Sequence, residues 1–374
     1  MSQNNSPYLD SAPPELPAGP PDMPQLQRHA TVFTGKTSEF FGIWIINVVL
    51  GILTLGIYSA WAKVRTERYF YSNTKIAGSP FEYLAEPIKI LKGRLIAYAL
   101  VITLSVLAHL QMFFLMVPLY LAIILAIPWM IYLGLRFRAR YSAWRGLKFR
   151  FVDGIYEAYV NFMFKPILGF FTGNLLWPWV RLSQHEYMGN GHRFGGKRFI
   201  FQGDLGKYYI PFLITLGIGA VALIIYMVLI FASIGIGEIS AEGGDKPSAD
   251  AMIWVMLPAI VFLYVAMFAI SIYIHTRYMN FFWNGLRLGT HHFESSLRAR
   301  DMLWLYFSNG IAILLSLGLA APWAMIRMAN YRAAHFTFIS AGNIDEFSAE
   351  FESGRDSTGS EMLDALDMDM DIGL

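Results

Sequence analysis

The sequence predicts a polytopic α-helical membrane protein with internal repeats, and three observations support this fold class. Of the 374 residues, 55% are hydrophobic and only 15% are charged, whereas about 25% of the residues of soluble domains are charged. Seven apolar stretches are long enough for the roughly 20 residues that a membrane-spanning helix needs. A motif centred on tryptophan recurs along the chain. Because cysteine is absent, disulfides, thiolate metal sites and cysteine nucleophiles are excluded.

Both ends of the chain differ from its centre. Residues 1–30 are polar and rich in proline, which predicts a disordered N-terminal tail. Residues 343–374 carry ten acidic side chains against Arg355 alone and predict a solvated acidic tail. The alternative for this second tail is a segment that folds onto the protein's own basic face. Residues 31–342 then form a repeat-containing membrane domain.

Four of the apolar stretches are uninterrupted and predict transmembrane helices in two hairpins. They cover 95–114, 117–135, 208–236 and 252–274. The second hairpin turns through 237–251, where Glu and Asp outnumber Lys. The charge of this turn is opposite to that of the other polar segments.

The remaining three stretches, 40–62, 158–180 and 303–326, could re-enter the membrane or span it. If only the four uninterrupted stretches cross, all twenty-four Lys and Arg of the intervening segments fall on one side together with both termini. If all seven cross, nine of these charges are left outside. The positive-inside rule therefore favours four crossings, three re-entrant or interfacial segments, and cytoplasmic termini.

The ambiguous stretches are copies of one another. Residues 55–65 read Leu-Gly-Ile-Tyr-Ser-Ala-Trp-Ala-Lys-Val-Arg, and residues 317–327 read Leu-Gly-Leu-Ala-Ala-Pro-Trp-Ala-Met-Ile-Arg. A Tyr or Phe follows eight residues after each of four tryptophans, which are Trp61, Trp129, Trp179 and Trp323. Such fixed spacing indicates internal duplication.

Short aromatic alternations follow the tryptophan motifs. Phe81-Glu82-Tyr83, Phe149-Arg150-Phe151 and Phe199-Ile200-Phe201 are examples, each close to turn residues. Alternation with a period of two between turn signals is typical of β-hairpins. Since the charges place these loops on one side, we expect a small cytoplasmic β-sheet built from repeated hairpins.

These residues resemble a known family. The Leu-Gly-Ile-Tyr-x-x-Trp-x-x-x-Arg run at 55–65, the Asn73-Thr74…Gly78-x-x-Phe81-x-Tyr83 that follows it, and the repeats are similar to the YjgN-like bacterial inner-membrane proteins, a domain of unknown function. The similarity covers roughly 31–342, and the last copy departs from the pattern at Ser340 and Asn343. The resemblance implies an inner-membrane location and no reaction, ligand or functional residue.

Three polar residues in the apolar stretches form a candidate membrane site. Lys165 is the basic group within 158–180, and it could hold an anion or reach the interface with its head group. Asn47 and Asn309 stand fourteen residues before their tryptophans. They could bind a polar ligand across a pseudo-symmetry axis or hydrogen-bond to broken helices.

The tryptophans and neighbouring arginines form candidate corners for lipid headgroups. These corners comprise Trp61, Arg65, Arg68, Trp129, Trp179, Arg181, Trp323 and Arg327. The alternative is that they serve as topology signals and interfacial anchors.

No phosphate-binding loop, dinucleotide fingerprint, zinc motif or nucleophile elbow occurs in the sequence. We therefore expect no catalytic residue, metal or cofactor, and a protein that is not an enzyme. The expected function is transport of a small molecule or anion across the inner membrane. The alternative is a scaffold or anionic-lipid-binding protein. The expected partners are the bilayer and anionic lipids but not nucleic acid, because orientation in the membrane already accounts for the basic loops.

Overall fold

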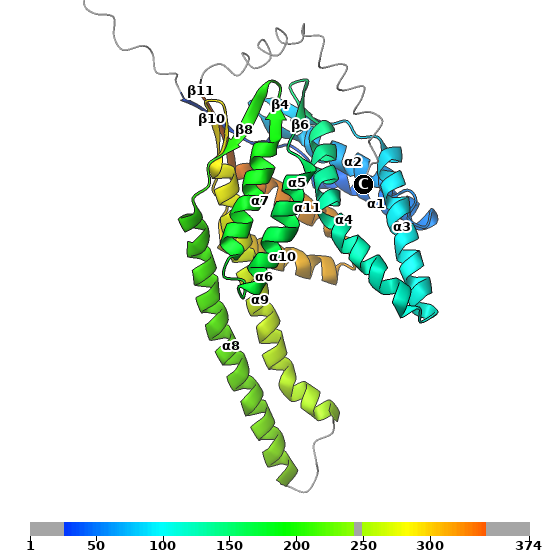
Figure 1. The fold of residues 1–374 in the computed structure, drawn as a ribbon, viewed down its shortest axis with the longest axis vertical. Coiled ribbons are helices and arrows are strands. Elements are labelled where there is room, and N and C mark those ends of the chain that lie inside the picture. The colour runs from blue at the N-terminus through cyan, green and yellow to red at the C-terminus, as the bar shows by residue number, and fades with distance from the viewer. Residues whose placement is uncertain (1–25, 243–248, 342–374) are drawn as a thin grey trace, which may run out of the picture.

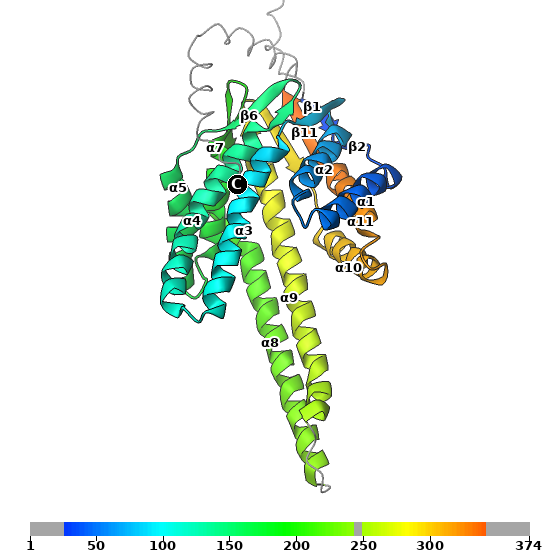
Figure 2. The ribbon, with the colours of Figure 1, turned by 90° about the vertical axis from the view of Figure 1, so that its right-hand side faces the viewer.

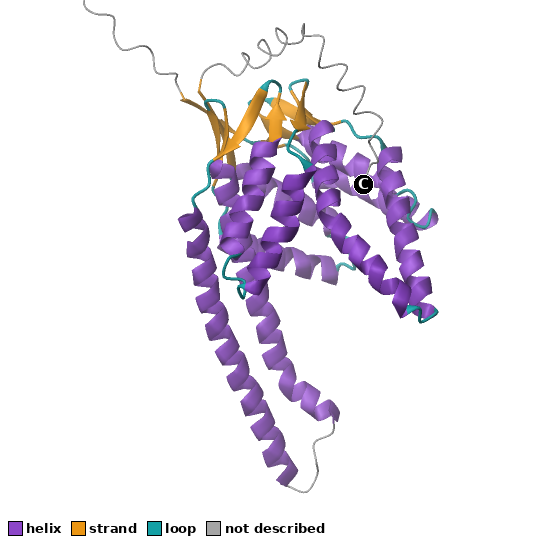
Figure 3. Ribbon diagram, viewed as in Figure 1, coloured by secondary structure: helices purple, strands orange, loops and turns teal. Residues whose placement is uncertain are grey.

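The computed structural model describes residues 26–242 and 249–341, with side chains described outside 233–255. Strands gather at one end of the molecule, and helical hairpins extend from it to different depths (Figures 1 and 3). The two predicted tails lie almost entirely outside the described residues. Of the expected N-terminal tail of 1–30, residues 26–30 form a strand, and the rest lies outside the described residues.

The strands form one antiparallel sheet of eleven strands. They are β1 (Leu26–Ala30), β2 (Val32–Phe33), β3 (Thr74–Ile76), β4 (Ser79–Tyr83), β5 (Ser142–Trp144), β6 (Leu147–Phe151), β7 (His192–Phe194), β8 (Lys197–Phe201), β9 (Leu286–Leu288), β10 (His291–Ser295) and β11 (Phe336–Ala341). The edge strands β1 and β2 are joined by the single residue Thr31, so the sheet closes on itself as a near-barrel. The expectation of a small cytoplasmic sheet is therefore wrong. Each described unit contributes its strands to this one closed sheet and does not form a separate hairpin of its own.

The helices occur as hairpins between these strands. They are α1 (Thr37–Leu53), α2 (Ser59–Asn73), α3 (Pro87–His109), α4 (Phe113–Arg140), α5 (Ile155–Tyr159), the π-helical turn η1 (Val160–Phe164), α6 (Lys165–Phe171), α7 (Trp177–Gly191), α8 (Leu205–Glu242), α9 (Ala249–Gly285), α10 (Ala299–Leu315) and α11 (Ala321–Ala334). The α8–α9 hairpin reaches farthest from the sheet, and α1, α10 and α11 lie on the opposite side from α4 and α5 (Figure 2).

The described chain consists of five units, each a strand, a helical hairpin and a second strand. In every unit the residue after the first strand donates its backbone N–H to the carbonyl of the residue before the second strand. These pairs are Thr34–Asn73, Leu84–Tyr141, Val152–Gly191, Gln202–Gly285 and Ser296–His335, at 2.8–3.0 Å. The same bond at the same place in all five units shows that they share one backbone design.

Between units the chain turns back through two-residue loops. In the first two of these loops both residues have positive φ, at Ala77 (48°) with Gly78 (76°), and at Arg145 (50°) with Gly146 (76°). Turns of this hand match the twist of the flanking strands. The loops therefore connect neighbouring units without breaking the sheet.

The structure confirms four helices that are long and apolar enough to cross a membrane. They cover Pro87–His109, Phe113–Arg140, Leu205–Ala232 and Met256–Gly285. The α3 helix begins at Pro87, before the predicted span at 95, and its first turns contain Lys89, Lys92 and Arg94. A span predicted from hydropathy leaves out these basic turns, although they belong to the same helix.

Each of the three ambiguous stretches contains a turn and returns to the sheet. The turns lie at 54–58, 172–176 and 316–320, and a hydroxyl side chain stands first in each. Thr54 Oγ1, for example, donates to Leu50 O at 2.7 Å and accepts the Tyr58 N–H at 2.9 Å. Ser316 makes the matching bonds to Ile313 O and from Ala320 N. These segments are therefore helical hairpins, not single spanning helices.

Candidate ligand cavity

A cavity of about 860 Å³ runs from the inside of the sheet to the space between α7, α9, α10 and α11. Ligand sites are typically between about 300 and 1,000 Å³ and mostly apolar. Its walls are largely apolar, with Trp144, Phe194 and Phe199 from the strands and Trp283 and Met302 from the helices. The cavity therefore has the size and surface of a site for an apolar small molecule.

Aromatic side chains from successive units line the strand part of the cavity. Phe81, Phe149, Phe199 and Phe293 each occupy the middle of a five-residue strand. The ring centroids of Phe149 and Phe199 are 6.4 Å apart, and those of Phe199 and Phe293 are 6.1 Å apart, both in stacked geometry. These distances lie within the range of favourable ring contacts. We call these four residues the phenyl ring set.

Further rings that line the cavity pack against the phenyl ring set. The ring centroid of Trp144 lies 6.1 Å from that of Phe81 and 5.8 Å from that of Phe194. The centroids of Phe338 and Phe293 are 5.4 Å apart. Phe194 and Phe338 are almost fully buried. This packing fixes the rings that face the cavity.

Few polar groups line the cavity. Arg332 and His275 are exposed side chains of its lining, and Arg332 donates to the Tyr306 hydroxyl at 3.3 Å. Within the described part of the chain, no Asp or Glu side chain lines the cavity. Since the lining has a cationic group and no carboxylate, it suits neutral or anionic molecules and disfavours cations.

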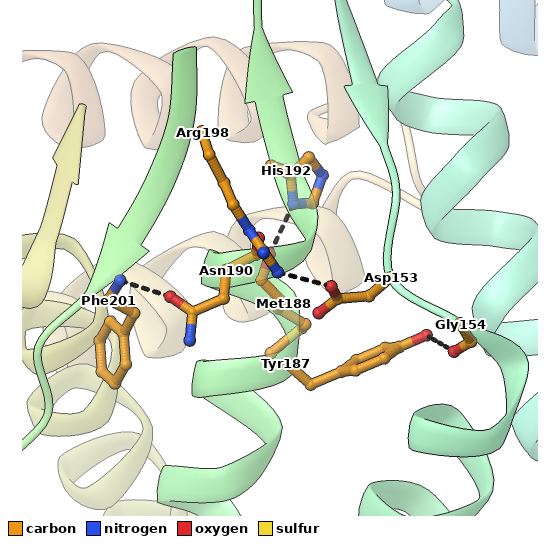
Figure 4. Close-up of polar contacts among 8 residues, drawn as sticks. All are labelled: Asp153, Gly154, Tyr187, Met188, Asn190, His192, Arg198 and Phe201. Atoms are coloured by element: carbon orange, nitrogen blue, oxygen red, sulfur yellow. Dashed lines mark hydrogen bonds and ion pairs between the residues drawn. The ribbon is translucent and has the colours of Figure 1, made fainter. Parts of the chain in front are cut away.

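His192 at the start of β7 is held by a polar cluster next to the cavity (Figure 4). Its Nδ1 lies 2.6 Å from Met188 O. Because a carbonyl can only accept, Nδ1 carries the hydrogen and Nε2 is the acceptor of the neutral ring. Burial lowers the pKa of His192. The ring is thereby favoured in its neutral form.

The strand β8 beside His192 is fixed by bonds to the loop after β6 and to the end of α7 (Figure 4). Arg198 Nη2 lies 2.7 Å from Asp153 Oδ1, and Arg198 Nε donates to Asn190 O at 2.6 Å. Burial raises the pKa of the Asp153 carboxyl, and the Arg198 guanidinium opposes part of this rise.

Two further contacts shown in Figure 4 connect α7 to the loop after β6 and to strand β8. The Tyr187 hydroxyl donates to Gly154 O at 3.1 Å, and Asn190 Oδ1 accepts the Phe201 N–H at 2.7 Å. In the next unit Asn284 Oδ1 accepts the Ser295 N–H in the same way. The repeated contact shows that this anchor belongs to the shared design of the units.

A buried histidine joins a short hairpin to a long one. His185 Nδ1 and the Tyr208 hydroxyl are 2.5 Å apart, and Tyr208 lies against Tyr278 with centroids 5.0 Å apart. Burial, with a smaller contribution from Arg181, lowers the pKa of His185 to about 3. His185 is therefore neutral at physiological pH.

Asn47 and Asn309 make equivalent contacts within separate hairpins. Asn47 Nδ2 donates to Ala62 O, and Asn309 Nδ2 donates to Ala324 O, both at 3.4 Å. Both asparagines are buried, and neither lines the cavity. The side-chain contacts described for them bridge the two helices of their own hairpins.

Lys165 occupies the same position of the third unit. Thr37 to Asn47, Ile155 to Lys165 and Ala299 to Asn309 are each ten residues apart, counted from the start of the unit's first helix. The Lys165 ammonium donates to Asn161 Oδ1 at 2.8 Å and lies 5.1 Å from the Trp179 ring centroid. Like the two asparagines, it contacts its own hairpin and lies outside the cavity lining.

The proposed Trp–Arg corners differ from one another. Arg327 lies over the Trp323 ring at 5.1 Å and donates to Asn309 Oδ1 at 3.0 Å. Arg65 and Arg68 are both exposed, and Arg68 donates to the Tyr83 and Ala85 carbonyls.

In the remaining corners, Arg181 donates to Gln184 Oε1 at 2.9 Å. Trp61 stacks on Tyr58 with centroids 6.2 Å apart, and Trp129 is half-buried in α4. Several corner residues therefore make their contacts within the protein.

Sequence reasoning missed the fourth unit, which contains α8 and α9, and the cavity. Tyr273 stands 13 residues before β9, the distance that separates Trp61 from β3, so the tryptophan signal is absent there. The aromatic alternations contained Phe81, Phe149 and Phe199, but only the closed sheet shows that they face one space. Among the described residues, no group of three or more His, Cys, Asp or Glu is placed to hold a metal ion.

Comparison with known proteins identifies the family. Residues 28–365 match a family described as "Bacterial protein of unknown function (DUF898)". The chain belongs to this family. It is similar to the inner membrane protein YjgN of Salmonella typhimurium, with 26% identity over 82% of this chain and 87% of that protein. It is also 44% identical to YjgN of Escherichia coli K12 over 15% of this chain and 14% of that protein. No solved structure matches.

Membership of this family agrees with the resemblance seen in the sequence. The relatives are named as inner membrane proteins, and this chain has four helices of membrane-spanning length and composition. The chain is therefore a membrane protein of the YjgN family.

Proposed function

We propose that this protein binds a neutral or anionic, largely apolar small molecule and transports it across the inner membrane. The observation that carries the proposal is the 860 Å³ cavity with apolar walls. The apolar walls of such a cavity offer few hydrogen-bond partners to water, so the cavity favours apolar ligands over water. Binding and release at such a site would be the protein's activity, and we propose no catalytic role for it.

The position of the cavity supports entry of the ligand from the bilayer. His275, Met279 and Trp283 line it and belong to α9, within a segment long and apolar enough to span. The same cavity continues among the strands, at the end of the molecule that carries the basic connecting segments. A molecule dissolved in the bilayer could thus enter between helices and reach the sheet.

We propose that both termini, and the basic segments with them, lie in the cytoplasm. The support is the excess of Lys and Arg in the segments that connect the hairpins. Single cysteines at positions 190 and 245, introduced into the cysteine-free chain, test this orientation. A membrane-impermeant thiol reagent is expected to label position 245 in intact cells and position 190 only after lysis, and the reverse pattern would contradict the proposal.

The binding proposal can be tested with 1-aminoanthracene, a neutral fluorescent probe. With the full chain in lipid nanodiscs, we expect saturable energy transfer from tryptophan to the probe, since Trp144 and Trp283 line the cavity. Ala329→Phe places a ring at the cavity wall and should weaken binding tenfold or more, with its melting temperature recorded in parallel. The exposed Ala334→Phe in the same helix is the control. Equal binding by the two variants would contradict the proposal.

The transport step has its own measurement. Proteoliposomes containing the wild-type chain should exchange the probe between leaflets faster than liposomes containing Ala329→Phe. Equal exchange rates in both preparations would leave binding intact and exclude transport through this cavity.

A second candidate function is binding of anionic lipid headgroups, with a scaffold role. Its support is a hollow of about 410 Å³ at the first corner, lined by Arg65, Arg68 and Tyr69. The lipid bilayer is then the partner, and we propose no nucleic-acid partner. Arg65→Gln should reduce co-purification of phosphatidylglycerol at least twofold, whereas Arg327→Gln, which loses internal bonds, should reduce stability instead. No change in lipid enrichment on Arg65→Gln would exclude this candidate.

A further inference from the structure

The five units place one equivalent position in a common layer around the inside of the sheet. Within four units the phenyl ring set pairs across the strands, as Phe81 with Trp144, Phe149 with Phe194, Phe199 with Leu288, and Phe293 with Phe338. In the first unit Val32 pairs with Lys75. The same register places the preceding residue, Thr31, opposite Ile76. Thr31 is therefore the fifth member of the layer, where a phenyl ring stands in each of the other units.

The Thr31 hydroxyl is buried without a hydrogen-bond partner. Thr31 is 7% exposed and lines the cavity, and its Oγ1 is fully buried and unpaired. Its backbone N–H is satisfied by Phe336 O at 3.1 Å, so the hydroxyl alone lacks a partner. Burying a hydroxyl without a hydrogen bond is unfavourable. Oγ1 has no surface open to the cavity that Thr31 lines, so the side chain would have to rotate about χ1 for a group in the cavity to supply the missing bond.

The other threonines of the cavity lining lack this property. Thr74 Oγ1 donates to Phe70 O at 2.8 Å, and Thr276 Oγ1 donates to Ile272 O at 2.7 Å. Both hydroxyls are bonded within the ordinary turns of their own segments. Thr31 is thus distinguished from two threonines in the same cavity.

The walls around Thr31 restrict what the partner can be. The strands contribute no Lys, Arg, Asp or Glu to the cavity lining among the described residues. An ionised group at this depth would be desolvated without compensation, so the ligand is neutral there. The neighbouring walls are aromatic faces and edges, which favour a flat ring between them.

We propose that Thr31 determines ligand specificity by donating a hydrogen bond to a carbonyl oxygen of a planar, neutral ring bound among Phe81, Phe149, Phe199 and Phe293. The ligand class is a quinone or a similar flat cyclic ketone, whose apolar substituent extends between α9 and α10 toward the bilayer. This inference rests on the proposed binding function of the cavity. It adds the orientation of the ligand, with its carbonyl group at the first unit.

The test compares menadione with 2-methylnaphthalene, which has the same ring skeleton without carbonyl groups. Binding is measured by titration calorimetry on the full chain in nanodiscs, with empty nanodiscs as the blank. Menadione cannot alkylate the protein through a thiol because the chain has no cysteine. The variants are Thr31→Val, which keeps the shape and removes the hydroxyl, Thr31→Ser, which keeps the hydroxyl, and Thr276→Val as the matched control.

We expect Thr31→Val to weaken menadione binding about fivefold, the value of one net hydrogen bond of about 1 kcal/mol. The affinity for 2-methylnaphthalene should not change, Thr31→Ser should retain the menadione affinity, and Thr276→Val should bind both probes as the wild type does. Because Thr31→Val removes an unpaired hydroxyl, its melting temperature without ligand should be equal to or above that of the wild type.

Three outcomes would overturn the inference. Wild-type affinity of Thr31→Val for menadione would show that the hydroxyl makes no bond to the carbonyl. An equal loss of both probes would show that Thr31 acts through shape alone. If the wild-type chain binds neither probe, and 1-aminoanthracene also fails to bind, the proposed function fails together with the inference.

Discussion

The three short helical hairpins and the two long ones differ in the membrane-directed part of the molecule but not at the sheet. Thr37 to Thr74, Ile155 to His192 and Ala299 to Phe336 are each 37 positions apart. In the long units the corresponding distances are 55 positions from Pro87 to Ser142 and 81 from Leu205 to Leu286. All five units nevertheless close with the same backbone hydrogen bond.

This difference shows which part of a unit is fixed and which can vary. The strand positions are fixed by pairing with neighbours on both sides, and a shift of one residue would turn every ring of that strand away from the cavity. The helix tips pack against few protein groups, and Leu55 and Leu317 are each 94% exposed. Helix length can therefore change by whole turns while the sheet is preserved.

The largest effect should come from a change at the fixed end. A Cβ at Gly191 would collide with the Phe151 ring at the junction of α7 and β7. Overpacking of this kind costs about 1–3 kcal/mol, so Gly191→Ala should lower the melting temperature of the purified chain. Gly134→Ala in α4 is the control, since no atom lies within 4 Å of its added Cβ. Equal melting temperatures for the two variants would contradict a rigid junction.

An intermediate effect should appear where a short hairpin meets a long one. The pKa of His185 is lowered to about 3 by burial, so the unfolded chain binds this proton more readily than the folded chain does. Stability contributed by the neutral ring is present above the unfolded pKa of about 6.5 and is lost as pH falls toward 3.

We therefore expect the free energy of unfolding to decrease by up to about 1.4 kcal/mol per pH unit below 6.5. Thermal melts of the wild type and of His185→Phe at pH 7.5 and pH 5 measure this slope. The slope should be smaller in His185→Phe, whereas the exposed His109→Gln should retain it. An unchanged slope in His185→Phe would exclude this histidine as its source.

The smallest effect should come from the tips. Leu55 and Leu317 have φ values of 50° and 52°, a region that Asn tolerates better than Leu. Leu55→Asn and Leu317→Asn should change the free energy of unfolding in detergent by less than about 0.5 kcal/mol. A loss of several kcal/mol in denaturant titrations would show that the tips pack against protein, contrary to the comparison of short and long units.

The sequence predicted the four long apolar helices and several strands because their patterns are local. Phe149-Arg150-Phe151, for example, alternates within β6 itself. The strands β3, β5, β7 and β9 have three residues each, too few for a periodic pattern. The closed sheet could not be predicted because its last pair joins Leu26 to Ala341, a contact of the whole chain.

The candidate site was predicted less well than the helices. Asn47, Lys165 and Asn309 attract attention because polar groups are rare in apolar stretches, yet their equivalence reflects hairpin construction. The residues that line the cavity are ordinary aromatic residues whose importance depends on register. Thr31 gives no signal in the sequence, since its position relative to Phe81 is defined only by the pairing of β2 with β3.

The pairing of β1 with β11 has a consequence for biosynthesis. The first described strand of the polypeptide finds its partner only when the last strand has been made, after all five hairpins have left the ribosome. Until then the growing sheet has two free edges, and unpaired edges invite association with other chains. Premature termination anywhere before β11 would therefore yield an open, aggregation-prone sheet and not a shorter functional protein.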